Sequence, residues 1–179
     1  EQDMRKMGGI WRLIPTTYIL MLIGSWALIG LPPFSGYFSK DLILETAHSA
    51  GSWVGITVFW LGTLVVAMTA IYSLKLIIMS FHGSLLADEK VVAHIHESPA
   101  SMLIPLFFLA FGAVAAGYLG LGMIDSHGSF WNGSLFVSEE HHGIKNIHHS
   151  PLWVKTLPIL MTLTGLAVAW FLFSKSPNY

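Results

Sequence analysis

The segment from residue 30 to residue 41 reads Gly30-Leu-Pro-Pro-Phe-Ser-Gly-Tyr-Phe-Ser-Lys-Asp41, which is a helix-breaking sequence followed by an ionisable pair in an apolar region. Two adjacent prolines remove backbone donors, and the neighbouring glycines let the chain turn. Irregular backbone at membrane depth is tolerated only where it is buried in protein or lines a cavity. A charge at that depth costs about 2.5–3.5 kcal/mol, so an intramembrane lysine indicates a functional site. The segment therefore predicts a broken transmembrane helix with Lys40 and Asp41 just after the break.

The composition is that of a membrane protein. Hydrophobic residues make up 54% of the chain and charged residues 11%, against roughly 25% charged residues in soluble domains, and the mean hydropathy is +0.64. The absence of cysteine excludes disulfides and thiolate metal sites, and the net charge of -1 argues against a nucleic-acid partner. Because the chain begins with Glu1, we expect it to be processed or partial.

The hydropathy pattern predicts an all-α, polytopic transmembrane helix bundle with one helix broken at Pro32-Pro33. Residues 14–50 are too many for one upright helix and too few for two complete spans. A helix over 15–31, a break at 32–36 and a second helix over 37–50 resolve this, either as one discontinuous span or as a span plus an interfacial helix. The other expected segments are an N-terminal flank at 1–13, transmembrane helices at 53–81, 101–123 and 152–173, loops at 82–100 and 124–150, and a C-terminal tail at 174–179.

The distribution of positive charge predicts the orientation. With four crossings, the N-terminal flank, the 82–100 loop and the C-terminus lie on one side of the membrane, and that side is expected to face the cytoplasm or the mitochondrial matrix. It carries Arg5, Lys6, Arg12, Lys90 and Lys175, whereas the opposite side carries Lys145 and Lys155.

Four residues are candidates for moving protons. Lys40 comes first, because burial disfavours the charged form of a lysine and so favours proton uptake and release, while Asp41 stabilises the ammonium. The alternative is that Lys40 reaches the interface and pairs locally. Lys75 lies near the end of its apolar run. Its side chain either extends to the membrane interface, as long charged side chains do near helix ends, or takes part in a proton relay. His48 closes the broken helix, and either a proton route or an interfacial position explains it.

The other histidines occur mainly as pairs in the loops, at His94-x-His96, His141-His142 and His148-His149. A zinc site requires three or four convergent ligands, and these pairs lie on opposite expected sides of the membrane. The sequence therefore predicts no metal site.

Several short segments together make the chain recognisable. They are Lys6-Met-Gly-Gly-Ile10, Ile14-Pro15-Thr16, Gly24-Ser-Trp-Ala-Leu28, Gly30-Leu-Pro-Pro-Phe-Ser-Gly36 and Phe38-Ser-Lys-Asp41. This pattern strongly resembles the C-terminal part of subunit 5 of respiratory complex I, the distal antiporter-like membrane subunit, which is related to Mrp-type antiporter subunits. The resemblance covers most of the chain, and residues 30–41 are its most specific part.

The resemblance implies a membrane subunit, without a redox centre of its own, of a proton-translocating NADH:ubiquinone reductase. Lys40 corresponds to the family's terminal channel lysine and Asp41 to the neighbouring acid, so the pair is expected to relay protons. No cofactor is expected in this chain, whereas NADH, FMN, iron-sulfur clusters and quinone are expected in partner subunits. The membrane is either the mitochondrial inner membrane or a bacterial plasma membrane.

The same resemblance implies partners. They are other complex I membrane subunits, including the adjacent antiporter-like subunit and a chain that supplies the N-terminal helices that family members have and this sequence lacks, together with lipids. Two alternatives remain open at this point. One is a subunit of a multisubunit cation/proton antiporter without electron transfer, and the other is a structural membrane module in which Lys40 is inert.

Overall fold

The computed structural model describes residues 3–87, 89–124, 130–131, 134 and 150–174. Over these residues the chain is helical and contains no strand. The elements are η1 (Met4–Lys6), η2 (Ile10–Arg12), α1 (Pro15–Ile29), α2 (Ser35–Ser49), α3 (Trp53–Phe81), α4 (Glu89–Val92), α5 (Ala100–Leu119), α6 (Leu121–Ile124) and α8 (Leu152–Ser174). The all-α fold class predicted from the hydropathy pattern is confirmed.

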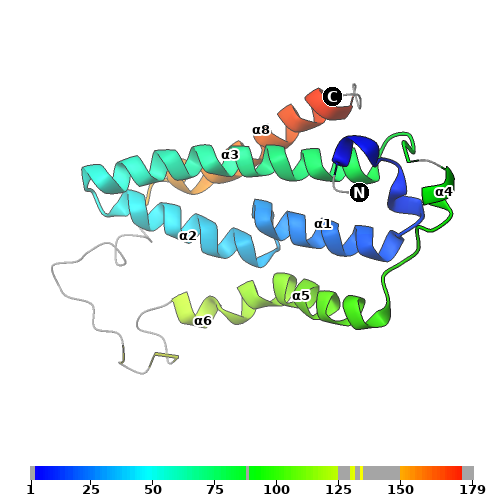
Figure 1. The fold of residues 1–179 in the computed structure, drawn as a ribbon. Helices are drawn as coiled ribbons and strands as arrows, with labels where there is room; N and C mark the ends of the chain where they lie inside the picture. The colour runs from blue at the N-terminus through cyan, green and yellow to red at the C-terminus, as the bar shows by residue number, and fades with distance from the viewer. Residues whose placement is uncertain (1–2, 88, 125–129, 132–133, 135–149, 175–179) are drawn as a thin grey trace.

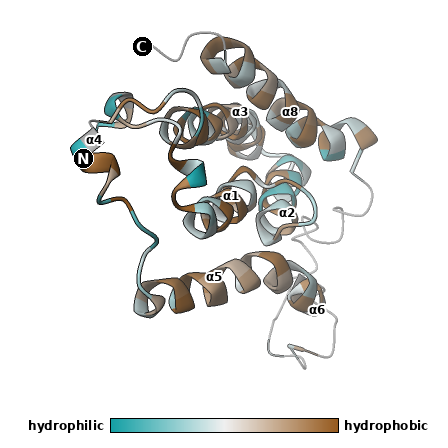
Figure 2. Cartoon of the chain, turned by 90° about the vertical axis from the view of Figure 1, so that its right-hand side faces the viewer, coloured by the Kyte–Doolittle hydropathy of each residue, from teal (hydrophilic) through white to brown (hydrophobic). Residues whose placement is uncertain are grey.

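The long helices are stacked in three layers (Figures 1 and 2). Helices α3 and α8 form one layer, the half-helices α1 and α2 form the next, and α5 lies beyond them. Helices α3, α5 and α8 are each long and apolar enough to cross a membrane. Their outward surfaces are largely apolar (Figure 2), as a lipid-facing bundle requires.

Helices α1 and α2 lie end to end alongside α3 (Figure 1). Each has 15 residues and α3 has 29, so the two half-helices together match the length of this one span. At about 1.5 Å of rise per residue, neither half-helix crosses the roughly 30 Å apolar core alone. This arrangement fits one discontinuous span rather than a span plus an interfacial helix.

The two spans of the first layer, α3 and α8, pack closely because each buries a single face. The buried residues of α8 recur every three or four positions, as one face of a helix requires. They are Val154, Pro158, Thr162, Gly165 and Ala169. The facing residues of α3 include Phe59, Thr63, Val66 and Ala70, all of them buried. Helices α1 and α2 lie against α3 of this pair, and α2 also contacts α8.

The break between α1 and α2 is a turn set by Gly30. Gly30 adopts a left-handed conformation, with φ 78° and ψ 45°, and Leu31 donates from its backbone N–H to the carbonyl of Trp26 at 3.1 Å. This six-residue closure is a Schellman motif, which glycine favours because it has no Cβ. Helix α1 therefore ends at Ile29, two residues before the predicted end, and α2 begins at Ser35, two residues before its predicted start.

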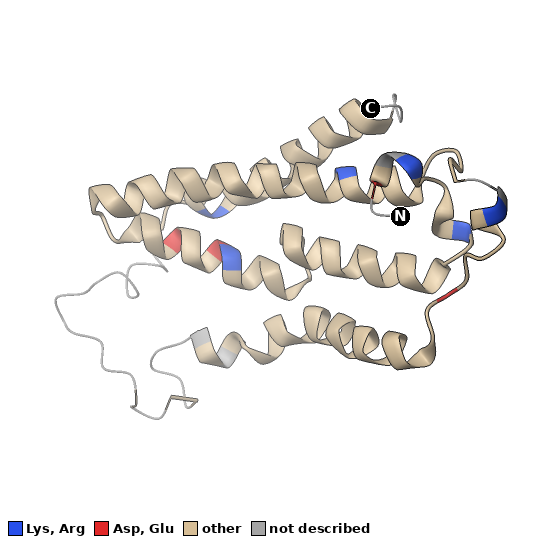
Figure 3. Cartoon of the chain, viewed as in Figure 1, with Lys and Arg blue, Asp and Glu red and all other residues tan. Residues whose placement is uncertain are grey.

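The N-terminal flank lies against the C-terminal end of α3. Gly8 donates to the carbonyl of Ser80 at 3.1 Å and Gly9 to that of His82 at 3.0 Å. Basic residues gather at this end of the bundle, where α4 also lies (Figure 3). The flank and α4 thus lie on one side, the arrangement on which the predicted orientation depends. Lys145 and Lys175, which also entered that prediction, lie outside the described residues.

Glu97, in the segment before α5, fastens that segment to the start of α1. Its carboxylate accepts hydrogen bonds from the backbone of Thr16 at 2.5 Å and from the hydroxyl of Thr17 at 2.8 Å. Burial alone would raise the pKa of this carboxyl, but the hydrogen bonds outweigh it and hold the pKa below its usual range. Glu97 thus acts as an N-cap for α1 that comes from 80 positions away.

Candidate functional site

Lys40 is anchored at the broken end of α1. Its ammonium donates to the backbone carbonyl of Ile29 at 2.6 Å and lies 3.5 Å from the hydroxyl of Thr162 on α8. The last carbonyls of any helix have no partner within that helix, so the break supplies an acceptor that a continuous helix would not expose. The helix-breaking sequence and the lysine therefore form a single site.

This site lies near the middle of the membrane span. A cavity of about 310 Å³ adjoins Lys40 and is lined by residues of α1, α2 and α3, among them Ile29, Leu44, Val65, Val66 and Thr69. Residues 65–69 surround the midpoint of α3, which runs from residue 53 to residue 81. Lys40 therefore sits at the depth where charged side chains are rare and usually functional.

Two carboxylates follow Lys40 along α2. Asp41 and Glu45 are four residues apart and therefore lie one above the other on one side of the helix. Among the described residues, neither oxygen of the Asp41 carboxylate has a hydrogen-bond partner, although both are buried. The same holds for one buried oxygen of Glu45, Oε1. Buried polar atoms are normally hydrogen-bonded, so these oxygens have the capacity to accept a hydrogen bond or a proton.

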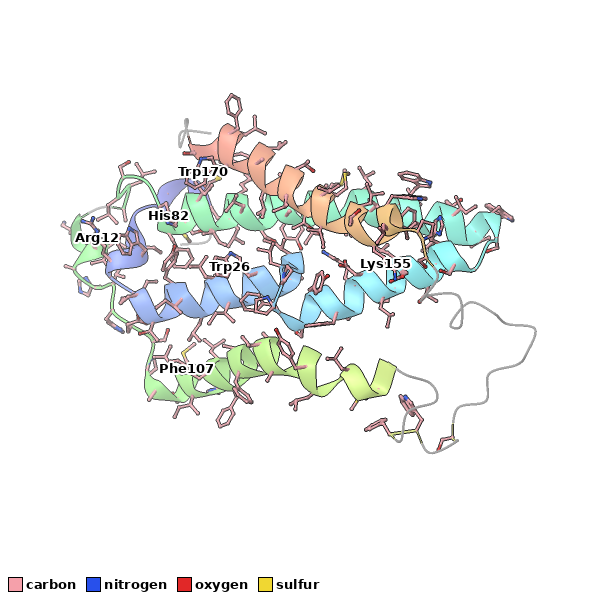
Figure 4. The ribbon with its side chains drawn as sticks, turned by 180° about the vertical axis from the view of Figure 1, so that it is seen from behind. Arg12, Trp26, His82, Phe107, Lys155 and Trp170 are labelled. Atoms are coloured by element: carbon pink, nitrogen blue, oxygen red, sulfur yellow. The ribbon has the colours of Figure 1, made fainter. Side chains whose placement is uncertain are left out.

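Lys155 of α8 reaches toward the second carboxylate. Its Nζ lies 3.4 Å from Oε1 of Glu45, an ion pair that falls short of hydrogen-bond geometry. The Glu45 side chain is 13% exposed and that of Lys155 is 38% exposed, so the acid is held inside and the base extends outward. Figures 3 and 4 show the charges along α2 and the position of Lys155 beside that helix. Helices α2 and α8 thus meet at Lys40 with Thr162 and again at Glu45 with Lys155.

His48 and Lys75, the other two predicted candidates, lie apart from the Lys40 anchor. The His48 ring packs edge-on against Phe59 at 5.1 Å and against Trp153 at 5.2 Å, near the end of α2. Lys75 lies toward the other end of α3, with its ammonium 5.1 Å from the centre of the Phe173 ring. Lys40 and Asp41 are neighbours on α2, and the relay roles of all four residues remain predictions.

Three side chains of this site were not predicted from the sequence. Glu45 carried a usable signal, because it lies four residues after Asp41 on the same helix. Thr162 and Lys155 carried none, because they lie more than 100 positions away from their partners on α2. Only the packing of α8 beside α2 brings them to the site.

The described residues include no group of three or more His, Asp or Glu side chains that could hold a metal ion. The pairs His141-His142 and His148-His149 lie outside the described residues. His94 and His96 bond instead to backbone carbonyls, of Lys90 at 2.7 Å and of Glu97 at 3.0 Å.

Together, the apolar helices and a half-buried lysine at a helix break define a class of protein. They are features of multi-pass membrane proteins that bind ions at discontinuous helices near the midplane. The family model described as "NADH:quinone oxidoreductase/Mrp antiporter, TM" matches residues 1–69, which include both half-helices and Lys40. Residues 1–69 are thus similar to this antiporter-like family, and the three long apolar helices are those of a multi-pass protein of an energy-transducing membrane.

The chain is also similar to named relatives over nearly its whole length. It is 40% identical to the NADH-ubiquinone oxidoreductase chain 5 of Phytophthora infestans over 97% of this chain and 26% of the relative. It is 40% identical to the chain 5 of Marchantia polymorpha over 95% of this chain and 26% of the relative. For the NADH-quinone oxidoreductase subunit L of Rickettsia typhi the identity is 38%, over 100% of this chain and 27% of the relative. These comparisons confirm the predicted resemblance, and the chain spans about a quarter of the length of these curated relatives.

Proposed function

We propose that this chain is part of the distal antiporter-like membrane subunit of a proton-pumping NADH:quinone oxidoreductase. The observation that carries the proposal is the Lys40 ammonium, held at mid-membrane by the Ile29 carbonyl at 2.6 Å. The named relatives are subunits of NADH-quinone and NADH-ubiquinone oxidoreductases, which supports the assignment to such a complex rather than to a free-standing antiporter.

Lys40 acts in this proposal as the last relay of a proton path. Its neutral amine takes up a proton, and the resulting ammonium is stabilised by a hydrogen bond to the carbonyl of Ile29 and by the charge of the neighbouring Asp41. When the surrounding electrostatics change, the proton leaves toward the end of α2. The cavity beside Lys40 provides the space that a hydrated approach to the amine requires.

The redox chemistry belongs to other subunits. Iron-sulfur clusters are held by cysteine thiolates, and this sequence contains no cysteine. We assign the clusters to partner chains for this reason, and we place NADH, flavin and quinone there too because the named relatives are subunits of NADH-quinone oxidoreductases. The expected partners are the adjacent antiporter-like subunit, a chain that supplies further helices to this subunit, and lipids.

Substitution of Lys40 in the native complex tests the proposal. Lys40→Ala is expected to abolish this subunit's share of NADH-driven proton pumping while the complex still assembles. Lys40→Arg separates two roles, because arginine keeps the charge and does not release its proton. Loss of pumping in both variants supports proton exchange at Lys40, whereas survival with arginine alone assigns a fixed charge. Undiminished pumping by Lys40→Ala contradicts the proposal, and a purified native complex without redox subunits favours the antiporter alternative.

A further inference from the structure

Besides Lys40 and Asp41, the structure contains a second pair of charged residues, Glu45 and Lys155. The Glu45 side chain is mostly buried, and that of Lys155 is half-exposed. We infer that Asp41 and Glu45 form the exit from Lys40, with Lys155 as the fixed positive charge that orients Glu45. This inference rests on the proposed function and names the residues by which the proton leaves. Neither Glu45 nor Lys155 was among the proton-relay residues predicted from the sequence.

The first support is the geometry of α2. At about 100° per residue, Lys40, Asp41 and Glu45 fall within an arc of roughly 140° on the helix surface. Glu45 lies five residues beyond Lys40, or about 7.5 Å further toward the end of α2. The route therefore leads away from the midpoint of the bundle along one side of a single half-helix.

The second support is the unused hydrogen-bonding capacity of the carboxylates. Within the described part of the chain, the buried oxygens of Asp41 and the buried Oε1 of Glu45 accept no hydrogen bond. A carboxylate kept out of water without donors is costly, and such groups at membrane depth mark ion or proton pathways. Thr46, the residue next to Glu45, differs because its hydroxyl donates to the Leu42 carbonyl of its own helix at 2.7 Å.

The third support is the position of Lys155. A purely structural pair would be expected to have close hydrogen-bond geometry, but Nζ and Oε1 are 3.4 Å apart without it. The half-exposed ammonium lies beside the buried Oε1 of Glu45 and attracts the carboxylate without donating a hydrogen bond to that oxygen. Helix α8 contacts the route twice, through Thr162 at Lys40 and through Lys155 at Glu45, seven residues or two turns apart.

The transfer requires no redox partner. An N–H bond of the Lys40 ammonium breaks and an O–H bond forms on the Asp41 carboxylate. That O–H bond then breaks as one forms on Glu45, and Glu45 releases the proton to water at the end of α2. Both carboxylates return to their charged forms, and Lys155 stays protonated throughout.

The test uses the native complex in sealed vesicles, with NADH oxidation and proton uptake measured together. Lys40→Met sets the value for complete loss of this subunit's pumping, and Thr46→Val serves as the matched control. Glu45→Gln is expected to reduce protons pumped per NADH to the Lys40→Met value, whereas Glu45→Asp, which keeps a titratable group, is expected to retain more than half of the wild-type value. Lys155→Arg is expected to pump like the wild type, because a fixed charge is sufficient.

The outcomes separate this inference from the proposed function. If Lys40→Met pumps normally, the proposed function fails and the inference fails with it. If Lys40→Met loses pumping while Glu45→Gln matches Thr46→Val, the exit route alone is wrong. If Glu45→Gln does not assemble, the Glu45→Asp variant decides. Pumping by Glu45→Asp with the ion pair to Lys155 lost supports the carboxylate as a proton carrier. Assembly of Glu45→Asp with no pumping overturns it.

Discussion

Replacing Gly30 with alanine should release Lys40 from its anchor without touching the lysine itself. Gly30 has φ 78°, and a left-handed conformation costs other residues roughly 1–2 kcal/mol. A Cβ at this position would lie 2.5 Å from the Lys40 Nζ, whereas ordinary contacts begin at 3.4 Å. The ammonium must therefore shift by about 0.9 Å, which displaces it from its position 2.6 Å from the Ile29 carbonyl.

The size of the effect follows from the lost bond. Hydrogen bonds of charged groups contribute about 1.5–3 kcal/mol, so the anchored position of Lys40 should become roughly 10- to 100-fold less populated. We expect Gly30→Ala to lower NADH-driven proton uptake in vesicles at an unchanged level of assembled complex on native gels. Gly24→Ala is the matched control, because a Cβ there meets no atom within 4 Å. Equal pumping by Gly30→Ala and Gly24→Ala would refute the anchoring of Lys40 by the broken helix.

Two further changes test contacts at the two ends of α1. Thr162→Val should alter proton uptake less than twofold, because the Thr162 hydroxyl lies 3.5 Å from Lys40 Nζ, at the limit of a hydrogen bond. A larger loss in the same vesicle assay would show that Thr162 is a principal partner of Lys40. Glu97→Ala removes the cap of α1 and should destabilise the attachment of α5 by about 1 kcal/mol, measured as faster proteolysis of the segment before α5. Because the pKa of Glu97 is lowered, its stabilising contribution should be fully present above pH 4.5 and lost as the pH falls through the lowered pKa. Proteolysis that is insensitive to Glu97→Ala and to acid would show that the carboxylate does not hold this segment.

The membrane fold was predictable because its signals are local. Runs of apolar residues mark the spans, and Pro32-Pro33 with Gly30 marks the break, whatever lies elsewhere in the chain. The bounds were less predictable, since the Schellman turn depends on backbone hydrogen bonds between Trp26 and Leu31 that a proline pattern does not encode. The predicted helix therefore ran two residues too far.

The candidate site was predictable only in part. Lys40 stood out because a charge beside a helix break is rare in an apolar region. Its partners are a backbone carbonyl and a threonine 122 positions away, and neither has a signature in the sequence. Glu97 shows the same limitation, because its role as a cap for α1 depends on the path of the chain between α4 and α5.

The broken helix also has an electrical consequence. The aligned peptide groups of a helix place roughly half a negative charge at its C-terminal end, and a continuous span places that charge at the membrane surface. Because α1 ends at Ile29, this partial charge lies at mid-membrane beside Lys40. The protein thus builds a site that attracts cations from backbone atoms alone. Side-chain substitution at position 40 removes the cation but leaves the field that favours one.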